Sequence, residues 1–254
     1  MPIWIVGGTG ESAAIVRAIS KVIANYVVTV TTPDARKLYD SKCRVVVGTM
    51  DRQSIELFCQ KYAIAAIVDA SHPFAREISQ NAIAISQKLN LPYLRYERAT
   101  VNTSASTTHF ELDSFATLLQ GDYLRGQKVL LTVGCKVLPQ FQPWQSRATL
   151  FARILPRLDS LQTALTSGFR SDRIIAFRPP VDEAMEKALW QQWQISLVVT
   201  KASGKSGGED IKRRVADRLN IPLITIARPT VKYPQQTSEI EKIVQFVRFT
   251  AQIK

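Results

Sequence analysis

Short apolar runs rich in β-branched residues recur along the chain, and segments of helical length separate them. A first series of runs lies at residues 3–6, 27–30, 44–47, 66–68 and 93–95. A second series lies at residues 129–133, 150–154, 174–177, 197–200 and 223–226. Strands that alternate with helices in this way are typical of βαβ units, so the pattern predicts an α/β fold with parallel sheets.

The polar segment 100–110 separates the two series and is poor in large aliphatic residues. We interpret it as a linker or an extended edge segment, and the linker is favoured. Two α/β domains of similar size are therefore expected, at residues 1–99 and 100–254. Near the end of the chain, Ile240, Ile243, Val244 and Val247 follow the spacing of an amphipathic helix, which predicts a helix over residues 238–253 that packs on a core.

The chain has 254 residues, with 33 basic and 21 acidic side chains and a formal net charge of +12. Such a charge attracts anions, whether nucleic acid, a phosphorylated cofactor or a polycarboxylate. The basic residues are dispersed, and no homeodomain, zinc-finger or RNP signature accompanies them. This favours a small anionic ligand and disfavours a nucleic-acid partner, although a basic nucleic-acid-binding α/β protein stays an alternative.

The cysteine and histidine content further restricts the kinds of protein and of functional site that this chain can be. Cys43, Cys59 and Cys135 lie far apart without a Cys-x-x-Cys pair, which predicts reduced thiols in a cytoplasmic protein. The first apolar residues are too few for a signal peptide, and no apolar stretch reaches the roughly 18 residues of a membrane span. His72 and His109 are the only histidines, so we expect no His-rich metal site.

Ligands of open parallel sheets bind beyond the carboxyl ends of the strands, so the residues after each apolar run are the first candidates for a site. After the first run, Gly8, Gly10 and Ala13 match the dinucleotide fingerprint G-x-G-x-x-A. In that motif, glycines let the backbone approach a pyrophosphate at a helix N-terminus. The match is weak by itself, and the preceding strand and following helix strengthen it.

Thr31 and Thr32 stand at the tip of the second run, and Arg36 and Lys37 follow closely. The nearest acid, Asp34, comes some 26 residues after Gly8. An enzyme that uses NAD has an acid near this position, which hydrogen-bonds the ribose 2′-hydroxyl. Hydroxyl groups backed by two cations suit a 2′-phosphate better, so the pattern favours NADP over NAD.

The fourth run continues into Asp69, Ser71, His72 and Pro73. Ser71 is a plausible helix N-cap, and Pro73 would stand in the first turn, where its missing N–H costs nothing. The cap does not account for His72. This histidine is expected either to line a pocket as a hydrogen-bonding group or, less often, to donate a proton.

The string Gly-Lys-Ser at 204–206 is not a P-loop, because the glycine that motif requires five residues earlier is replaced by Val199. The loop instead combines hydroxyl, ammonium and glycine groups at Thr200, Lys201, Ser203, Gly204, Gly207 and Gly208. At a strand end and a helix N-terminus, these groups predict an anion-binding loop.

Two further strand ends carry similar groups. Thr132, Gly134 and Lys136 follow the run at 129–133, and Arg178 follows the run at 174–177. Cations that repeatedly terminate strands predict a positively lined site for an anionic ligand.

Taken in order, several motifs resemble those of the precorrin-6A reductases. They are GGTGES (7–12), DASHPFA (69–75), LLTVG (130–134), FRPP (177–180) and TKASGKSGG (200–208), and the match runs from Gly7 to about Pro229. The resemblance implies two Rossmann-like domains with the active site between them. It also implies NADPH-dependent reduction of a carbon–carbon double bond of precorrin-6A, or of its cobalt form, to precorrin-6B in cobalamin biosynthesis. Ser12 and Ala202 depart from the family pattern, which leaves cofactor contacts at those two positions open.

The motifs and the resemblance together select the site residues. Those expected to bind NADPH are Gly7, Gly8, Thr9, Glu11, Thr31, Thr132, Gly134, Lys136, Lys201, Ser203, Gly204, Gly207 and Gly208. Those expected to bind the tetrapyrrole polycarboxylate are Ser71, His72, Pro73 and Arg178. The loop at 201–208 would hold either part of the cofactor or substrate carboxylates, and the proton donor is open between Lys201, His72 and water.

One further alternative is another NADP-dependent reductase of an anionic substrate. A short-chain reductase would carry a Tyr-x-x-x-Lys pair, and the tyrosines of this chain, such as Tyr39 and Tyr93, have no lysine four residues later. The sequence leaves open the oligomeric state and whether the substrate carries cobalt.

Overall fold

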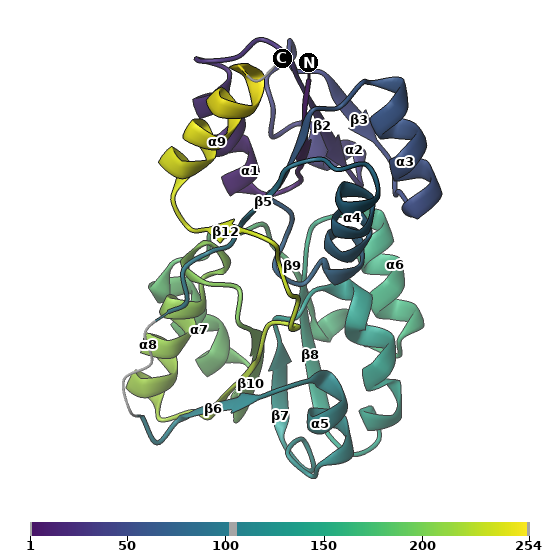
Figure 1. The fold of residues 1–254 in the computed structure, drawn as a ribbon. Coiled ribbons are helices and arrows are strands. Elements are labelled where there is room, and N and C mark those ends of the chain that lie inside the picture. Colours follow the sequence, from purple (N-terminus) through teal and green to yellow (C-terminus); the bar gives the residue numbers. More distant parts are fainter. Residues whose placement is uncertain (1, 102–105, 253–254) are drawn as a thin grey trace. The chain divides into compact units, whose positions relative to one another are not determined.

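The structure is a computed structural model that describes residues 2–101 and 106–252 (Figure 1). The chain divides into two compact units, a first domain of Met1–Ala99 with Pro229–Lys254 and a second domain of Thr100–Arg228. Each domain contains one 6-stranded sheet. Across the residues described, every helix is too short or too polar to cross a bilayer.

The first domain is a parallel sheet covered by helices on both faces. Its strands are β1 (Ile3–Val6), β2 (Tyr26–Val30), β3 (Val45–Val47), β4 (Ala66–Asp69), β5 (Tyr93–Tyr96) and β12 (Gln236–Thr237). Their order is β12-β5-β4-β1-β2-β3, and neighbours run parallel. The short helix α2 (Pro33–Arg36) follows β2.

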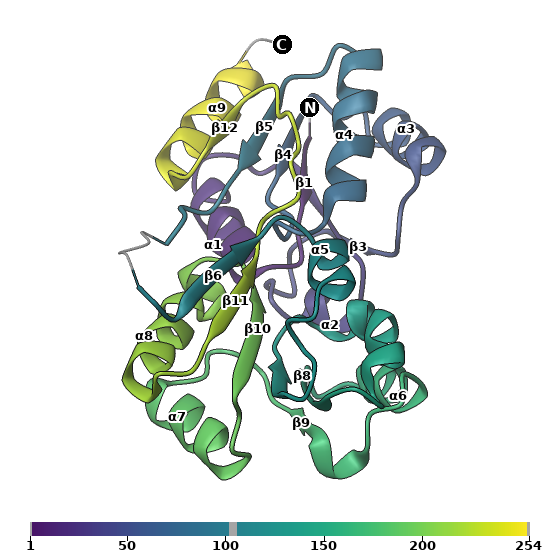
Figure 2. The same cartoon turned by 90° about the horizontal axis from the view of Figure 1, so that it is seen from below.

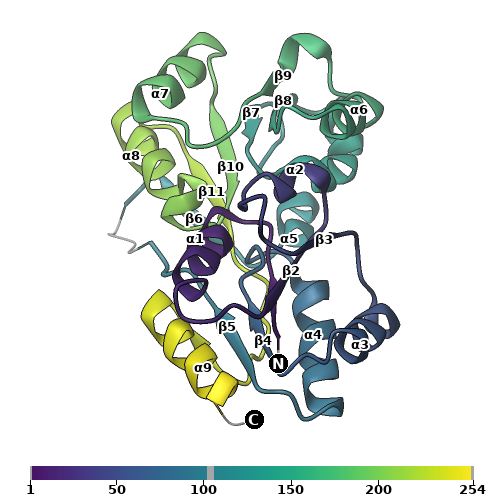
Figure 3. The same ribbon diagram turned by 90° about the horizontal axis from the view of Figure 1, so that it is seen from above.

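Alternate residues of each central strand enter different cores. In β1, Ile3 and Ile5 pack with helices α1 (Gly10–Ile19) and α9 (Ile240–Gln252) on one face (Figure 3). Trp4 and Val6 pack on the other face, which α3 (Arg52–Lys61) and α4 (Arg76–Lys88) cover (Figure 3). Burial on both faces explains why the strands are continuous apolar runs.

The second domain repeats this architecture. Its strands are β6 (His109–Leu112), β7 (Lys128–Leu131), β8 (Thr149–Ile154), β9 (Ile174–Ala176), β10 (Leu197–Lys201) and β11 (Leu223–Ile226), in the parallel order β6-β11-β10-β7-β8-β9. Figure 2 shows α7 (Glu183–Gln192) and α8 (Glu209–Leu219) on one side of the sheet, and α5 (Phe115–Gln120) and α6 (Leu158–Thr166) on the other. Short 3₁₀ helices, η1 (Cys135–Trp144), η2 (Ser171–Arg173) and η3 (Lys205–Gly207), complete the domain.

Each sheet has a point where the direction of strand addition reverses. In the first domain, β2 and β3 lie on one side of β1, whereas β4 and β5 lie on the other. In the second domain, the reversal falls between β7 and β10. Ligands of doubly wound sheets bind outside the carboxyl ends at such switch points. The loops that follow β1, β4, β7 and β10 are therefore the places where the topology predicts a site.

The predicted α/β fold with two parallel sheets is confirmed, and every predicted run overlaps a strand. The predicted boundaries of the second domain, 100–254, are corrected, because the structure places Pro229–Lys254 with the first domain. The physical reason is the apolar face of α9, whose Ile243, Val244 and Val247 are buried in the same core as β1 and α1. The location of the active site between the domains stays a prediction.

The interpretation of segment 100–110 as a linker is only partly tested. Residues 102–105 lie outside the described residues. Residues 109 and 110 belong to β6, which pairs with β11 at the edge of the second sheet. At its end, the segment is thus the extended edge that was the less favoured alternative.

Candidate functional site

The turn after β1 has the geometry of a dinucleotide fingerprint. Gly8 has φ of +102°, which a glycine adopts without strain. At Gly10, no described atom beyond the adjacent chain lies within 4 Å of where a Cβ would stand, so the turn is open to a ligand. Ala13 is buried against the sheet. A tight turn, an open approach and a packed helix are the features that hold a pyrophosphate, and these residues fit a dinucleotide cofactor.

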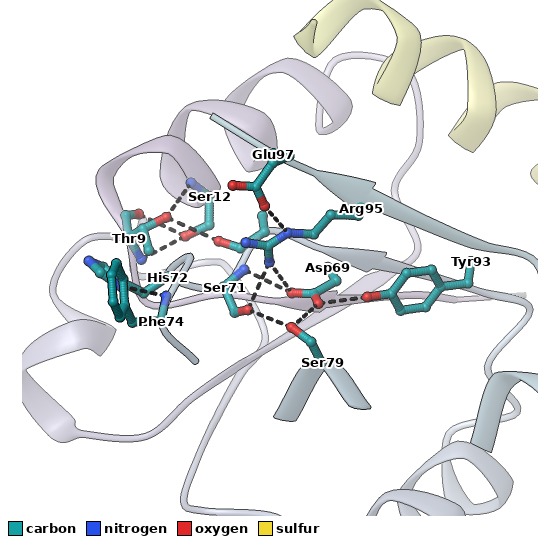
Figure 4. Close-up of polar contacts among 11 residues, drawn as sticks. Thr9, Ser12, Asp69, Ser71, His72, Phe74, Ser79, Tyr93, Arg95 and Glu97 are labelled. Atoms are coloured by element: carbon teal, nitrogen blue, oxygen red, sulfur yellow. Dashed lines mark hydrogen bonds and ion pairs between the residues drawn. The ribbon is translucent and has the colours of Figure 1, made fainter. Parts of the chain in front are cut away.

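Helix α1 begins with a capping box that involves Ser12, the residue that departs from the family pattern. Thr9 Oγ1 accepts a hydrogen bond from the Ser12 amide at 3.0 Å, and Ser12 Oγ accepts one from the Thr9 amide at 2.9 Å (Figure 4). The Thr9 hydroxyl also donates to the Ala70 carbonyl at 3.1 Å. This bond joins the β1 and β4 sides of the switch point.

Tyr39 supports this turn, a role that no local motif indicates. Its phenolic oxygen accepts the Gly8 N–H at 2.8 Å and lies 2.6 Å from Ser12 Oγ. Burial raises the pKa of the Tyr39 phenol above its usual value. A Cβ on Gly7 would stand 2.3 Å from the Tyr39 oxygen and 2.8 Å from Val28 Cγ1. Gly7 is therefore needed for packing, whereas its predicted contact with the cofactor stays a prediction.

Gly7→Ala is expected to lower the free energy of unfolding by about 1–3 kcal/mol, because the added methyl overpacks the site. Denaturant unfolding measures the loss. In a Tyr39→Phe background, where the phenolic oxygen is removed, the same substitution should cost less. An equal cost in both backgrounds would show that Tyr39 is not the obstacle.

Glu11 is neutralised by a residue distant in sequence. Its Oε1 lies 2.6 Å from Arg98 Nε, and its Oε2 accepts from Arg98 Nη2 at 2.9 Å. The pair offsets the negative charge that Glu11 brings to the first turn of α1. An anion at this helix N-terminus would therefore meet less repulsion.

The end of β2 differs in part from the expectation. Thr31 is exposed at the strand end, as the prediction requires. Lys37 pairs with Asp34 at 2.9 Å. The Arg36 guanidinium donates to carbonyl oxygens of the following loop, at Tyr39, Asp40, Ser41 and Cys43. Arg36 thus holds this loop, and the expectation that it backs Thr31 is not supported.

The loop after β4 is organised differently from the prediction. Helix α4 begins at Arg76, and its N-cap residue is Ala75, so Ser71 is not the helix cap. Ser71 instead accepts a hydrogen bond from buried Arg95 at 2.9 Å (Figure 4). Pro73 is buried and precedes the helix. The prediction that Ser71 caps the helix was wrong because its hydroxyl is bound by Arg95, a residue distant in the sequence.

His72 lies in the same loop and is half-buried. Its Nδ1 accepts the Phe74 N–H at 3.2 Å, and the two rings are 6.0 Å apart (Figure 4). The imidazole is therefore held at the β4 side of the switch point. Its predicted contact with substrate is compatible with this position and stays a prediction.

In the second domain, Lys201 ends β10 beside the residues that follow β7. Burial lowers the pKa of Lys201 to about 8; Cys135 has a smaller effect that raises this pKa, and the positive charge of Lys136 lowers it further. Its ammonium also lies 5.9 Å from the centre of the Phe115 ring. An amine that titrates near neutrality is suited to proton transfer.

The remaining predicted residues of this domain fall into two groups. Thr132 and Gly134 follow β7, next to β10, and the Thr132 hydroxyl donates to the Val199 carbonyl at 3.2 Å. Lys136 is the second residue of η1, and its charge lies close enough to lower the pKa of Lys201. Arg178 follows β9 at the edge of the sheet, with β8 between it and β7, and is not brought to the switch point.

Side chains of helix α8 hold the glycine loop between β10 and α8 by hydrogen bonds to its backbone. The Gly204 N–H donates to Glu209 at 2.9 Å, and the buried Lys212 ammonium donates to the carbonyls of Gly207 and Gly208. A Cβ on Gly207 would stand 1.9 Å from Ser203 Oγ. Several glycines are thus explained by packing, and their anion contacts stay predictions.

Burial lowers the pKa of Lys212 to about 8 as well. Neither Lys212 nor Glu209 was selected from the sequence, where both look like members of a charged helix surface. Within residues 2–101 and 106–252, no group of three or more His, Cys, Asp and Glu side chains is arranged to hold a metal ion.

Comparison with known proteins agrees with this organisation. Residues 2–248 match the family model described as Precorrin-6x reductase CbiJ/CobK. The chain is 47% identical over 249 residues to the cobalt-precorrin-6A reductase of Synechocystis sp., covering 96% of this chain and 95% of that protein. It is 32% identical to the cobalt-precorrin-6A reductase of Priestia megaterium, covering 95% and 96%.

A solved structure of CobK precorrin-6A reductase superposes with a TM-score of 0.83 at 19% identity, covering 98% of this chain and 97% of that one. This match supports the fold. With the family model spanning nearly the whole chain, the protein belongs to the precorrin-6x reductase family CbiJ/CobK.

Proposed function

We propose that this reductase uses NADPH to reduce one carbon–carbon double bond of cobalt-precorrin-6A, giving cobalt-precorrin-6B. The observation that carries the cofactor assignment is the turn at the β1/β4 switch point, which is open at Gly10 and capped at Thr9. The relatives from Synechocystis and Priestia megaterium are both named for the cobalt substrate, which favours the cobalt form over the metal-free ring.

The first domain would bind the cofactor. Amides of the turn formed by Gly8, Thr9 and Gly10 would hold the pyrophosphate, because the N-terminus of α1 favours an anion. Thr31, exposed at the end of β2, would contact the adenosine ribose and its 2′-phosphate. When bound, the cofactor supplies a hydride to one carbon of the double bond.

The second domain would supply the cationic groups. Lys201 ends β10, and Lys136 lies in η1 after the adjacent strand β7. Both would attract carboxylates of the tetrapyrrole. The net charge of +12 supports an anionic substrate of this kind. We assign Lys201 as the donor of the proton that adds to the neighbouring carbon. Its pKa of about 8 leaves the amine protonated at neutral pH and makes it a stronger acid than an ordinary lysine.

Other properties follow from this assignment. Cys43, Cys59 and Cys135 carry free thiols, which suits a reducing compartment, and we place the enzyme in the cytoplasm. The assignment includes neither a nucleic-acid partner nor a resident metal ion.

The test is a binding titration followed by a turnover assay. Nucleotide fluorescence should show tighter binding of NADPH than of NADH, and neither ATP nor a DNA duplex should compete at similar concentrations. Turnover should then be faster with cobalt-precorrin-6A than with the metal-free ring. Tighter binding of DNA than of NADPH would reject the assignment, and equal binding of NADH would reject the cofactor preference.

A further inference from the structure

A fully buried ion pair lies under the β1/β4 switch point. Asp69 ends β4, Arg95 lies in β5, and both side chains are 0% exposed. Their closest atoms, Asp69 Oδ1 and Arg95 Nη1, are 2.9 Å apart (Figure 4). Asp69 Oδ2 accepts from the Ser79 hydroxyl at 2.6 Å and from the Tyr93 hydroxyl at 2.7 Å. The carboxylate therefore joins two strands and helix α4.

The charged form of Asp69 is the one that this environment selects. Burial by itself would raise its pKa, but Arg95 and the hydrogen bonds from Ser79, Ser71 and Tyr93 outweigh burial, and the pKa is lowered. Even so, a buried ion pair is a weak source of stability, because two charges lose their hydration. Well-packed apolar residues would hold β4 and β5 together as well. The pair is better explained by the geometry it imposes.

That geometry acts on the loop after β4. Arg95 Nη1 donates to Ser71 Oγ at 2.9 Å, and the Ser71 N–H donates to Asp69 Oδ1 at 3.0 Å. The hydroxyl and the N–H of Ser71 are thus both held by the pair. The loop has no help from a helix cap, because the N-cap residue of α4 is Ala75, whose methyl group cannot accept a hydrogen bond.

Ala70 and His72, the two residues beside Ser71, link its position to the candidate site. The Ala70 carbonyl accepts the hydroxyl of Thr9, the N-cap of α1. His72 follows Ser71 directly, and its ring accepts the Phe74 N–H. A displacement of Ser71 would therefore move the imidazole and loosen the cap of the cofactor-binding turn.

We propose that Asp69 and Arg95 are positioning residues of the active site, which fix the 70–72 loop and through it His72 and Thr9 without touching cofactor or substrate. The proposal rests on the function proposed above for its kinetic consequences. Its structural part, the placement of His72, stands independently of that function.

The test uses Asp69→Asn and Arg95→Lys in the full-length protein. Asp69→Asn keeps the shape and removes the charge, and Arg95→Lys keeps the charge but removes the planar group that reaches both Asp69 and Ser71. The chain has 2 histidines, so two sets of imidazole ring-proton resonances report on structure by NMR. We expect the His72 resonance to shift in both variants, whereas that of His109, in β6 of the second domain, should not.

Kinetics and binding give the functional readout. Both variants should lose about 10- to 100-fold in kcat/KM, the effect expected when reacting groups are misplaced by about 1 Å. NADPH affinity should fall in the same variants. Ile19→Ala is the control, because Ile19 is buried at the far end of α1. It should lower the melting temperature without moving the His72 resonance or kcat/KM.

Each result decides the matter. Variants that keep the His72 resonance and kcat/KM would overturn the proposal, even if their melting temperature falls. If Asp69→Asn does not fold, Arg95→Lys alone carries the test. A wild-type protein that neither binds NADPH nor turns over the substrate would reject the proposed function, and the NMR comparison would still decide whether the pair positions His72.

Discussion

Lys201→Met is expected to lower kcat by about 100-fold or more, the usual contribution of a general acid. Methionine keeps the length and apolar body of the side chain beside Phe115 but cannot donate a proton. Steady-state rates of NADPH oxidation with cobalt-precorrin-6A measure the loss. Lys205→Met is the matched control, because Lys205 lies in the same loop, is exposed, and should leave kcat unchanged.

The pH profile separates proton donation from substrate attraction. Burial lowers the pKa of Lys201 to about 8, so the protonated donor predominates below that pH and kcat should fall as the pH rises through about 8. In Lys201→Met this decline should disappear. A variant that retains kcat with a raised KM would show that Lys201 attracts carboxylates and that the proton comes from elsewhere.

The same pKa fixes the sign of the stability change. The folded protein holds the Lys201 proton less tightly than the unfolded chain, whose lysine has the ordinary value of 10.5. The free energy of unfolding should therefore rise with pH between about 8 and 10.5. Lys201→Met removes this contribution, so the variant should be folded at neutral pH and its low activity cannot be ascribed to unfolding.

Gly10→Val is expected to raise the Kd for NADPH by about 100-fold, or about 2.7 kcal/mol, while the protein stays folded. A Cβ at Gly10 meets no described atom beyond the adjacent chain within 4 Å, so the fold can accept it. The bound pyrophosphate cannot, because the branched side chain would occupy its approach to the α1 amides. Fluorescence titration gives the Kd, and thermal unfolding confirms the fold.

The control for this variant is Arg17→Val, an exposed position in the last turn of the same helix. It introduces the same β-branched residue without touching the turn. Unchanged NADPH binding in Gly10→Val would move the cofactor away from the β1/β4 switch point, and the loop between β10 and α8 would then be the next site to test.

Much of the fold was predictable because its central strands are buried on both faces, so that each appears in the sequence as a continuous apolar run. The spacing of Ile243, Val244 and Val247 likewise predicts a helix with one buried face. The spacing cannot say which core the face enters, and the return of α9 to the first sheet was missed for that reason.

The sequence by itself determined the α/β class and the strand ends that glycines and cations of the candidate site follow, because local composition and chain order suffice for both. Only the tertiary structure decided the partners of those residues: Tyr39 beneath the glycine turn, Arg95 on Ser71, and Lys212 under the second loop. Each of these contacts depends on how strands and helices pack, and no local pattern encodes it. For that reason the local sequence predicts Ser71 as a helix cap, whereas in the folded protein its hydroxyl accepts a hydrogen bond from Arg95.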